Sequence, residues 1–176
     1  RLGEAISLAS SFKLFDNGGI SKSDFIGLWT LFNYLRPNIY IESGVFIGSS
    51  LWACLSSSSN TKIIGIDPNL SQLRIPVKFL RKTKLIDNRD FSEINFNITC
   101  KPIIAYFDDH INSADRIIQC SRKGIKYLIF DDSQGFEGTL RRRFPAFPCI
   151  PFIVNSDLIN PGDFIGWSYS LVKPKG

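Results

Sequence analysis

Several residue types and patterns are scarce in this sequence of 176 residues, and each scarcity excludes something. There is a single histidine and no methionine, and because even an initiating methionine is missing we expect residues beyond this chain. No apolar run approaches the roughly 20 residues of a membrane-spanning helix, so we expect no membrane partner. The four cysteines form no C-x-x-C pair. This argues against a metal or disulfide framework and favours buried thiols in a reducing, cytoplasmic compartment.

What is present is typical of a globular domain. Apolar residues make up 44% of the chain and the mean hydropathy is +0.02, values that fit neither a disordered nor a membrane protein. Because no repeat or linker divides the sequence, we interpret 1–176 as one domain. It comprises a helical segment (1–36), a core (38–135) and a loop or lid (136–163). The net charge of +5 permits an acidic partner such as nucleic acid but does not specify the fold.

Helical and strand patterns alternate along the chain. A capping-box pattern of Ser21 and Asp24 opens a helix over 21–35 with an apolar stripe at helical spacing. Ser49 and Ser50 are suited to cap a second helix. We expect part of 72–80 to be helical. We also expect a helix after residue 110, whose apolar face comprises Ile111, Ala114, Ile117 and Ile118. Apolar strand-like runs occupy 38–43, 62–67, 83–86, 102–107 and 125–130.

This alternation predicts an α/β fold. Strands that read as near-continuous apolar runs belong to a parallel sheet covered on both faces. We therefore expect a Rossmann-like, doubly wound, mostly parallel sheet with helices on both faces. Residues 163–173 alternate in polarity and predict a C-terminal antiparallel strand.

Polar residues follow four of these strands. In an open parallel sheet, ligands bind beyond the carboxyl ends of the strands, at the switch in strand order. The fold would therefore gather these residues at one edge, which predicts a ligand pocket there. They are Glu42 to Gly48, Asp67, Asp108 to His110, and Asp131 to Ser133.

The loop after the first strand carries Gly44 and Gly48. Gly44 would let the backbone approach a ligand and Gly48 would allow tight packing at the helix start, although such a pair is often only a tight turn. Asp67 stands about 20 residues further on, where a carboxylate accepts hydrogen bonds from a ribose diol. The alternative for Asp67 is an Asx turn before Pro68.

These residues resemble a known family. Glu42-x-Gly-x-x-x-Gly48-x-Ser50, followed by Ile64-Gly-Ile-Asp67-Pro, looks like the first two motifs of class I S-adenosylmethionine-dependent methyltransferases. The closer likeness is to the cephalosporin hydroxylase-like and small-molecule O-methyltransferase branches, over roughly residues 38–135. The resemblance implies a cofactor pocket formed by Glu42, Gly44, Gly48 and Ser50, with Asp67 on the ribose, and Asp90 and Phe91 beside adenine.

Metal-dependent members of this family place carboxylates after the fourth and fifth strands. Asp109, Asp131 and Asp132 match those positions. The resemblance therefore implies a site for Mg²⁺ or another divalent cation, which prefers hard oxygen ligands. The alternative is that these aspartates cap helices and turns.

One position departs from the family pattern. Catechol-type methyltransferases carry a lysine three residues after the first metal aspartate, where this chain has Asn112. Asparagine is no general base at neutral pH, whereas histidine, the residue type at position 110, commonly serves as one. His110 is therefore our candidate base, with Asp109 as its catalytic partner through the metal. The alternative is a structural imidazole.

The leading hypothesis is a methyltransferase that acts on a small-molecule hydroxyl. The basic clusters Lys78–Lys84 and Arg141–Arg143 are read in three ways: as a nucleic-acid surface, as contacts for an anionic substrate, or as solvated faces. Two alternatives therefore stay open. One is a non-catalytic or nucleic-acid-binding module, and the other is a hydroxylase-like or sugar-modifying relative on the same fold.

Overall fold

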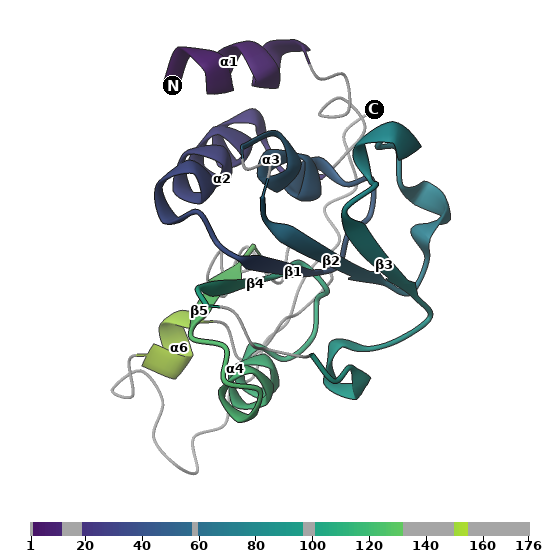
Figure 1. The fold of residues 1–176 in the computed structure, drawn as a ribbon. Coiled ribbons are helices and arrows are strands. Elements are labelled where there is room, and N and C mark those ends of the chain that lie inside the picture. Colours follow the sequence, from purple (N-terminus) through teal and green to yellow (C-terminus); the bar gives the residue numbers. More distant parts are fainter. Residues whose placement is uncertain (1, 12–18, 58–59, 97–100, 132–149, 155–176) are drawn as a thin grey trace, which may run out of the picture.

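The computed structural model contains a five-stranded parallel sheet with the order β3-β2-β1-β4-β5 (Figure 1). It describes residues 2–11, 19–57, 60–96, 101–131 and 150–154. Every strand pair is parallel, which confirms the predicted sheet. The antiparallel strand predicted within 163–173 lies outside the described residues. The strands are β1 (Ile39–Ser43), β2 (Lys62–Asp67), β3 (Thr83–Asp87), β4 (Ile103–Phe107) and β5 (Tyr127–Phe130).

Helices cover both faces of the sheet, as predicted. One face carries α1 (Leu2–Ser11), α2 (Lys22–Leu35) and α3 (Ser49–Ser57), whereas α4 (Ser113–Arg122) and the short α6 (Ile150–Val154) lie on the other (Figure 1). Helix α6 falls within the segment predicted to be a loop or lid, and a five-residue helix is compatible with a lid, so this stays a prediction. The rest of 136–163 lies outside the described residues.

Helix α2 forms as its sequence predicts. Ser21 accepts a hydrogen bond from the backbone N–H of Asp24, and the Asp24 carboxylate accepts one from the backbone of Ser21. This reciprocal pair satisfies two N–H groups that would otherwise be unpaired at the helix start. The helix ends at Leu35, before Pro37, with Arg36 in the left-handed conformation.

Helix α4 buries a different face from the one predicted. Ile111 and Ile118 are 44% and 47% exposed, whereas Arg116 and Cys120 are buried. The helix begins after Asn112, whose side chain accepts hydrogen bonds from the N–H groups of Ala114 and Asp115. The prediction of an inward apolar face failed because a charged residue occupies the inner position, where it has partners on other loops.

The core is divided by the sheet into two apolar layers. Alternate residues of β1 enter opposite layers: Tyr40 packs with α2 and α3, and Ile41 packs on the side of α4. The segment 72–80, predicted to be partly helical, contains the end of one short 3₁₀ helix, Leu70–Gln72, and the whole of another, Val77–Phe79. Within the described part of the chain, no helix is both long and apolar enough to span a membrane.

Candidate functional site

The strand order reverses between β1 and β4, and the polar strand ends meet there. The backbone N–H of Asp108 donates to the carbonyl of Ser43 at 2.9 Å. On the other side of β1, the N–H of Gly44 donates to the carbonyl of Ile66 at 2.9 Å. The ends of β1, β2 and β4 are thus joined at the switch point, where ligands bind in this class of sheet.

The loop from Gly44 to Gly48 is held in a conformation that needs glycine. Both glycines have φ of +89°, a region that residues with a Cβ rarely adopt. A Cβ on Gly44 would lie 2.2 Å from the carbonyl oxygen of Asp108, and one on Gly48 would lie 2.7 Å from Leu73 Cδ1. Gly44 therefore lets the loop approach the end of β4, and Gly48 allows the tight packing that the sequence predicts.

Asp67 holds this loop at the end of β2 through hydrogen bonds. Its Oδ2 accepts hydrogen bonds from the backbone N–H groups of Val45 and Phe46, both at 2.8 Å. Its Oδ1 accepts one from the N–H of Asn69 at 2.7 Å, which confirms the Asx-turn interpretation. The carboxylate is 8% exposed and also borders a cavity. Its contact with a ribose stays a prediction.

Two adjoining cavities open at this edge of the sheet. The smaller measures about 380 Å³ and the larger about 560 Å³, and their walls share Gly44, Pro68 and Asp109. The smaller is bordered also by Ser43, Ile66, Asn88, Arg89, Asp90, Ile111 and Arg116. The larger is bordered also by Gly19, Phe46, Asp67, Asp108, His110 and Asp131.

Glu42 and Ser50, both assigned to the cofactor by resemblance, bond to one another inside the core. Ser50 Oγ donates to Glu42 Oε1 at 2.7 Å, and Tyr40 Oη donates to Oε2 at 2.6 Å. Glu42 is fully buried and borders neither cavity. Burial raises the pKa of the Glu42 carboxyl to about 8, although its two hydroxyl donors act in the opposite direction. The direct cofactor contacts expected of this pair are not supported.

Ser49 and Ser50 also differ from the predicted caps. Helix α3 begins at Ser49 itself, so the two serines are its first residues. Ser49 Oγ accepts a hydrogen bond from the backbone N–H of Ile20 at 3.1 Å. The two hydroxyls therefore tie α3 to neighbouring segments, Ser49 to the chain before α2 and Ser50 to β1.

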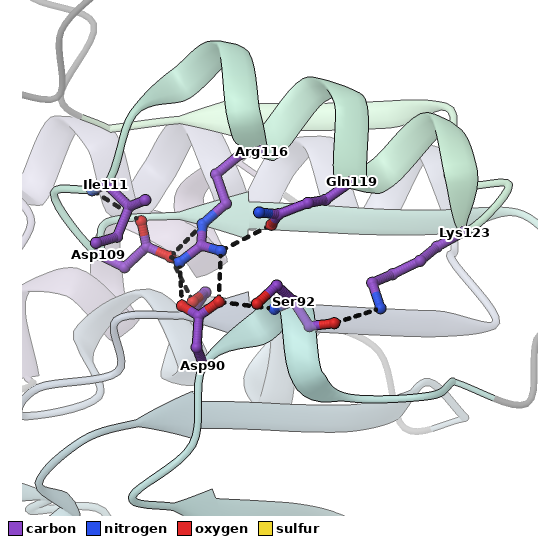
Figure 2. A network of polar contacts seen from close by, with 8 residues as sticks. Asp90, Ser92, Asp109, Ile111, Arg116, Gln119 and Lys123 are labelled. Atoms are coloured by element: carbon purple, nitrogen blue, oxygen red, sulfur yellow. Dashed lines mark hydrogen bonds and ion pairs between the residues drawn. The ribbon is translucent and has the colours of Figure 1, made fainter.

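Asp90 and Asp109 are joined by Arg116 at the wall of the smaller cavity (Figure 2). Arg116 Nη1 and Nη2 contact the two oxygens of Asp90 at 3.1 and 2.6 Å. Nε and Nη2 contact Asp109 Oδ2 at 3.0 and 2.8 Å. Arg116 holds the pKa of Asp90 well below its usual range. Burial by itself would lower the pKa of Arg116, but its hydrogen bonds and the two carboxylates raise it.

The sequence reasoning missed Arg116. Its side chain is only 1% exposed, and a charged group is almost never buried so deeply without partners. Arg116 lies seven residues after its partner Asp109, but the apolar pattern of this helix predicted that the isoleucines face inward. Its other partner, Asp90, lies 26 residues away in the sequence, so no local pattern could have linked them.

Phe91 does not line the cavity as predicted. It is fully buried and packs between Phe96 and Phe107, with ring centroids at 5.3 and 5.0 Å. The prediction failed because the side chain of Phe91 turns into the core beneath Asp90. The apolar wall of the smaller cavity is formed instead by Ile66, Pro68 and Ile111.

Asp109 does not fit the predicted metal site. In addition to Arg116, its Oδ2 accepts a hydrogen bond from Ser43 Oγ at 2.5 Å, and its Oδ1 accepts one from the N–H of Ile111. A carboxylate so engaged, beside a fixed positive charge, offers little to a cation. No cluster of three potential metal ligands occurs in the described ranges. Asp131 borders the larger cavity, whereas Asp132 lies outside the described residues.

His110 lies at the mouth of the larger cavity, as predicted. The residue is exposed and has φ of +56°, and it follows the two aspartates that end β4 on the cavity wall. Asn112, which stands where related enzymes have a lysine, caps α4. The side-chain oxygen of Asn112 is used in this cap. His110 therefore stays the candidate base.

The described wall of the larger cavity is acidic. It carries Asp67, Asp108, Asp109 and Asp131, and no lysine or arginine among the placed residues. The anionic substrate was predicted from Arg141–Arg143, which lie outside the described residues. Of the other basic cluster, Lys78 lies over the ring of Phe79, 4.9 Å from its centroid. The roles of both clusters stay predictions.

Comparison with known proteins yields solved structures only. No family model and no curated protein matches this sequence. A structure of CmcI with SAH superimposes with a TM-score of 0.59 at 21% identity, covering 66% of this chain and 63% of CmcI. A second, CmcI with Mg and SAM, gives a TM-score of 0.53 at 23% identity and covers 66% of this chain and 55% of CmcI.

A third similar structure is that of the O-methyltransferase TomG from Streptomyces achromogenes, involved in tomaymycin synthesis and solved with SAM. Its TM-score is 0.56 at 16% identity, and the match covers 81% of this chain and 74% of TomG. These identities are low, and this chain spans less than two thirds of either CmcI chain. The likeness shows that the chain has the fold of these proteins, which were solved with SAM or SAH.

Proposed function

We propose that this chain is a methyltransferase that binds S-adenosylmethionine and methylates a hydroxyl of a small molecule. The observation that carries the proposal is the pair of adjoining cavities at the switch point. The walls of both cavities include Gly44 and Pro68. The loop from Gly44 to Gly48 is held by hydrogen bonds to Asp67. An elongated cofactor with a nucleoside at one end and an amino acid at the other suits two connected cavities better than one.

The residues present fit such a cofactor. Ile66, Pro68 and Ile111 offer an apolar wall to the flat adenine ring, with Asn88 and Asp90 as polar neighbours. Asp67 lies at the end of β2 facing the larger cavity, where it is suited to accept hydrogen bonds from the ribose hydroxyls. Gly44 leaves room for the ligand at the junction. When bound, S-adenosylmethionine supplies an electrophilic methyl group on a positively charged sulfur.

The chain's own part in the chemistry is to position the acceptor and remove its proton. We assign that proton to the imidazole of His110, which is exposed at the mouth of the larger cavity. Once deprotonated, the acceptor oxygen would be placed to take the methyl group that the bound cofactor would supply. Placing the two reactants in line in a confined cavity supplies much of the acceleration in such reactions. Divalent-metal assistance stays a prediction for Asp131 and Asp132, and no step here depends on it.

Isothermal titration of S-adenosylmethionine into the purified chain tests the proposal, with Asp67→Ala as the variant. We expect binding in the micromolar range that falls at least about tenfold in the variant, because the loop loses its fastening and the ribose its acceptor. Lys126→Gln is a matched surface control that removes an exposed charge. If the folded chain binds no cofactor, and instead binds RNA or DNA in a salt-sensitive way, it is a nucleic-acid-binding module.

A further inference from the structure

The side chain of Arg116 contacts three other side chains, those of Asp90, Asp109 and Gln119. Its three nitrogens make five contacts with oxygen atoms: two with Asp90, two with Asp109 and one with Gln119 Oε1 at 2.8 Å (Figure 2). A guanidinium carries five N–H groups. The side chain is only 1% exposed, and four of these five contacts are hydrogen bonds that Arg116 donates inside the protein.

The surroundings hold this positive charge in one place. The guanidinium carbon lies 5.6 Å from the ring centroid of Phe91 and 5.8 Å from that of Phe107. Aromatic faces attract cations and exclude water from them. The two carboxylates come from different elements, Asp90 from the segment after β3 and Asp109 from the end of β4. Arg116 on α4 therefore joins three elements around one cation.

Both carboxylates border the smaller cavity. Two aspartates that converge at a sheet edge repel each other unless a cation lies between them. Oxygen-rich sites of this kind often hold Mg²⁺ or Ca²⁺. Here the cation is part of the chain, and it already contacts both oxygens of Asp90 and Oδ2 of Asp109.

We propose that Arg116 is the built-in cation of this site, a positioning residue that holds Asp90 and Asp109 at the wall of the smaller cavity in place of a divalent ion. The inference rests on the proposed function in so far as the smaller cavity receives part of the cofactor. Two consequences follow. Cofactor binding needs no divalent cation at Asp109, and removal of the guanidinium leaves a carboxylate pair that accepts one.

The test compares the whole chain with Arg116→Gln by isothermal titration. For the unmodified chain, Mn²⁺ titrated alone gives the baseline uptake, because any site at Asp131 and Asp132 contributes equally to the unmodified chain and to the Arg116 variants. Arg116→Gln should bind the cofactor about tenfold or more weakly. It should also bind Mn²⁺, and Mn²⁺ should restore much of the lost affinity. A merely structural arginine would not be replaced by a metal ion.

Two further variants complete the design. Arg122→Gln removes an exposed charge from the same helix and should change neither property. Arg116→Lys keeps the charge but cannot reach both carboxylates with paired N–H groups. It should therefore show an intermediate loss of cofactor affinity, and it decides the question if Arg116→Gln does not fold.

The proposal is overturned if folded Arg116→Gln binds the cofactor normally, or if it takes up no more Mn²⁺ than the unmodified chain does. It is likewise overturned if Arg116→Lys behaves as the unmodified chain in both titrations. If no form binds S-adenosylmethionine, the proposed function fails, but the titration with Mn²⁺ alone still decides whether Arg116 occupies the place of a divalent ion.

Discussion

Replacing Glu42 with glutamine should abolish a pH dependence of stability that arises inside the core. Glu42 is fully buried, and burial is the main cause of its raised pKa, with the charges of Asp67 and Asp131 adding to it. The hydroxyls of Tyr40 and Ser50 act in the opposite direction. The pKa is about 8 in the folded chain, against an ordinary value of 4.5.

The direction of the effect follows from proton binding. Below pH 4.5 the carboxyl is protonated in both states, and its contribution to stability is fully present. As the pH rises toward 8, the unfolded chain releases the proton while the folded chain still holds it, so stability is lost. One pKa unit corresponds to about 1.4 kcal/mol. Over this interval the loss amounts to roughly 3 to 5 kcal/mol, a large part of the stability of a typical domain.

Urea unfolding followed by circular dichroism at constant ionic strength measures this loss. The free energy of unfolding should fall between pH 5 and pH 8 for the unmodified chain, relative to Glu42→Gln, because the amide of the variant cannot ionise. Glu93→Gln is the control, since Glu93 forms only an exposed pair with Arg89 and should leave the slope unchanged. A difference between unmodified chain and Glu42→Gln that stays flat over this range, within about 0.5 kcal/mol, would refute the reasoning.

Substitutions at three other positions test separate parts of the site. Gly44→Ala places a Cβ 2.2 Å from the carbonyl oxygen of Asp108 at φ of +89°. The free energy of unfolding, measured by thermal unfolding, should fall by about 3 kcal/mol or more. A fall below about 1 kcal/mol would contradict this geometry. Asn112→Ala removes the cap of α4 and should cost about 1 kcal/mol in the same assay, whereas Asn112→Asp should retain most of it. In His110→Asn the new residue also tolerates positive φ. Once an acceptor is found, kcat of this variant should fall about a hundredfold, with the affinity for the cofactor unchanged. An unchanged kcat would exclude His110 as the base.

The sheet and α2 were predictable because their signals are local. Buried parallel strands read as apolar runs bounded by polar residues, and the pair of Ser21 and Asp24 identifies a helix start within four residues. The position of the site was predictable for the same reason, since parallel strands bring their carboxyl ends to one edge. Asp67 and His110 accordingly lie at the larger cavity.

The inner contacts were not predictable, because they depend on partners far along the chain. Arg116 was overlooked since helical spacing placed isoleucines on the inner face, and only Asp90 and Asp109 together make its burial favourable. Glu42 was assigned to the cofactor from its place in the motif. It shares a face of β1 with Tyr40, because alternate strand residues point the same way. That face is covered by α2 and α3, which is why its carboxyl turns inward.

The hydrogen bonds from the loop 44–48 to Asp67 affect two quantities in ligand binding: the association rate and the conformational entropy lost. The N–H groups of Val45 and Phe46 are already engaged by a carboxylate of the chain itself, so the loop adopts its final shape without help. A receptor that is shaped in advance spends little conformational entropy on association, and its apparent affinity is not reduced by a small competent fraction. Association should therefore follow a single exponential whose rate rises linearly with ligand concentration, with no slow rearrangement limiting it at saturation.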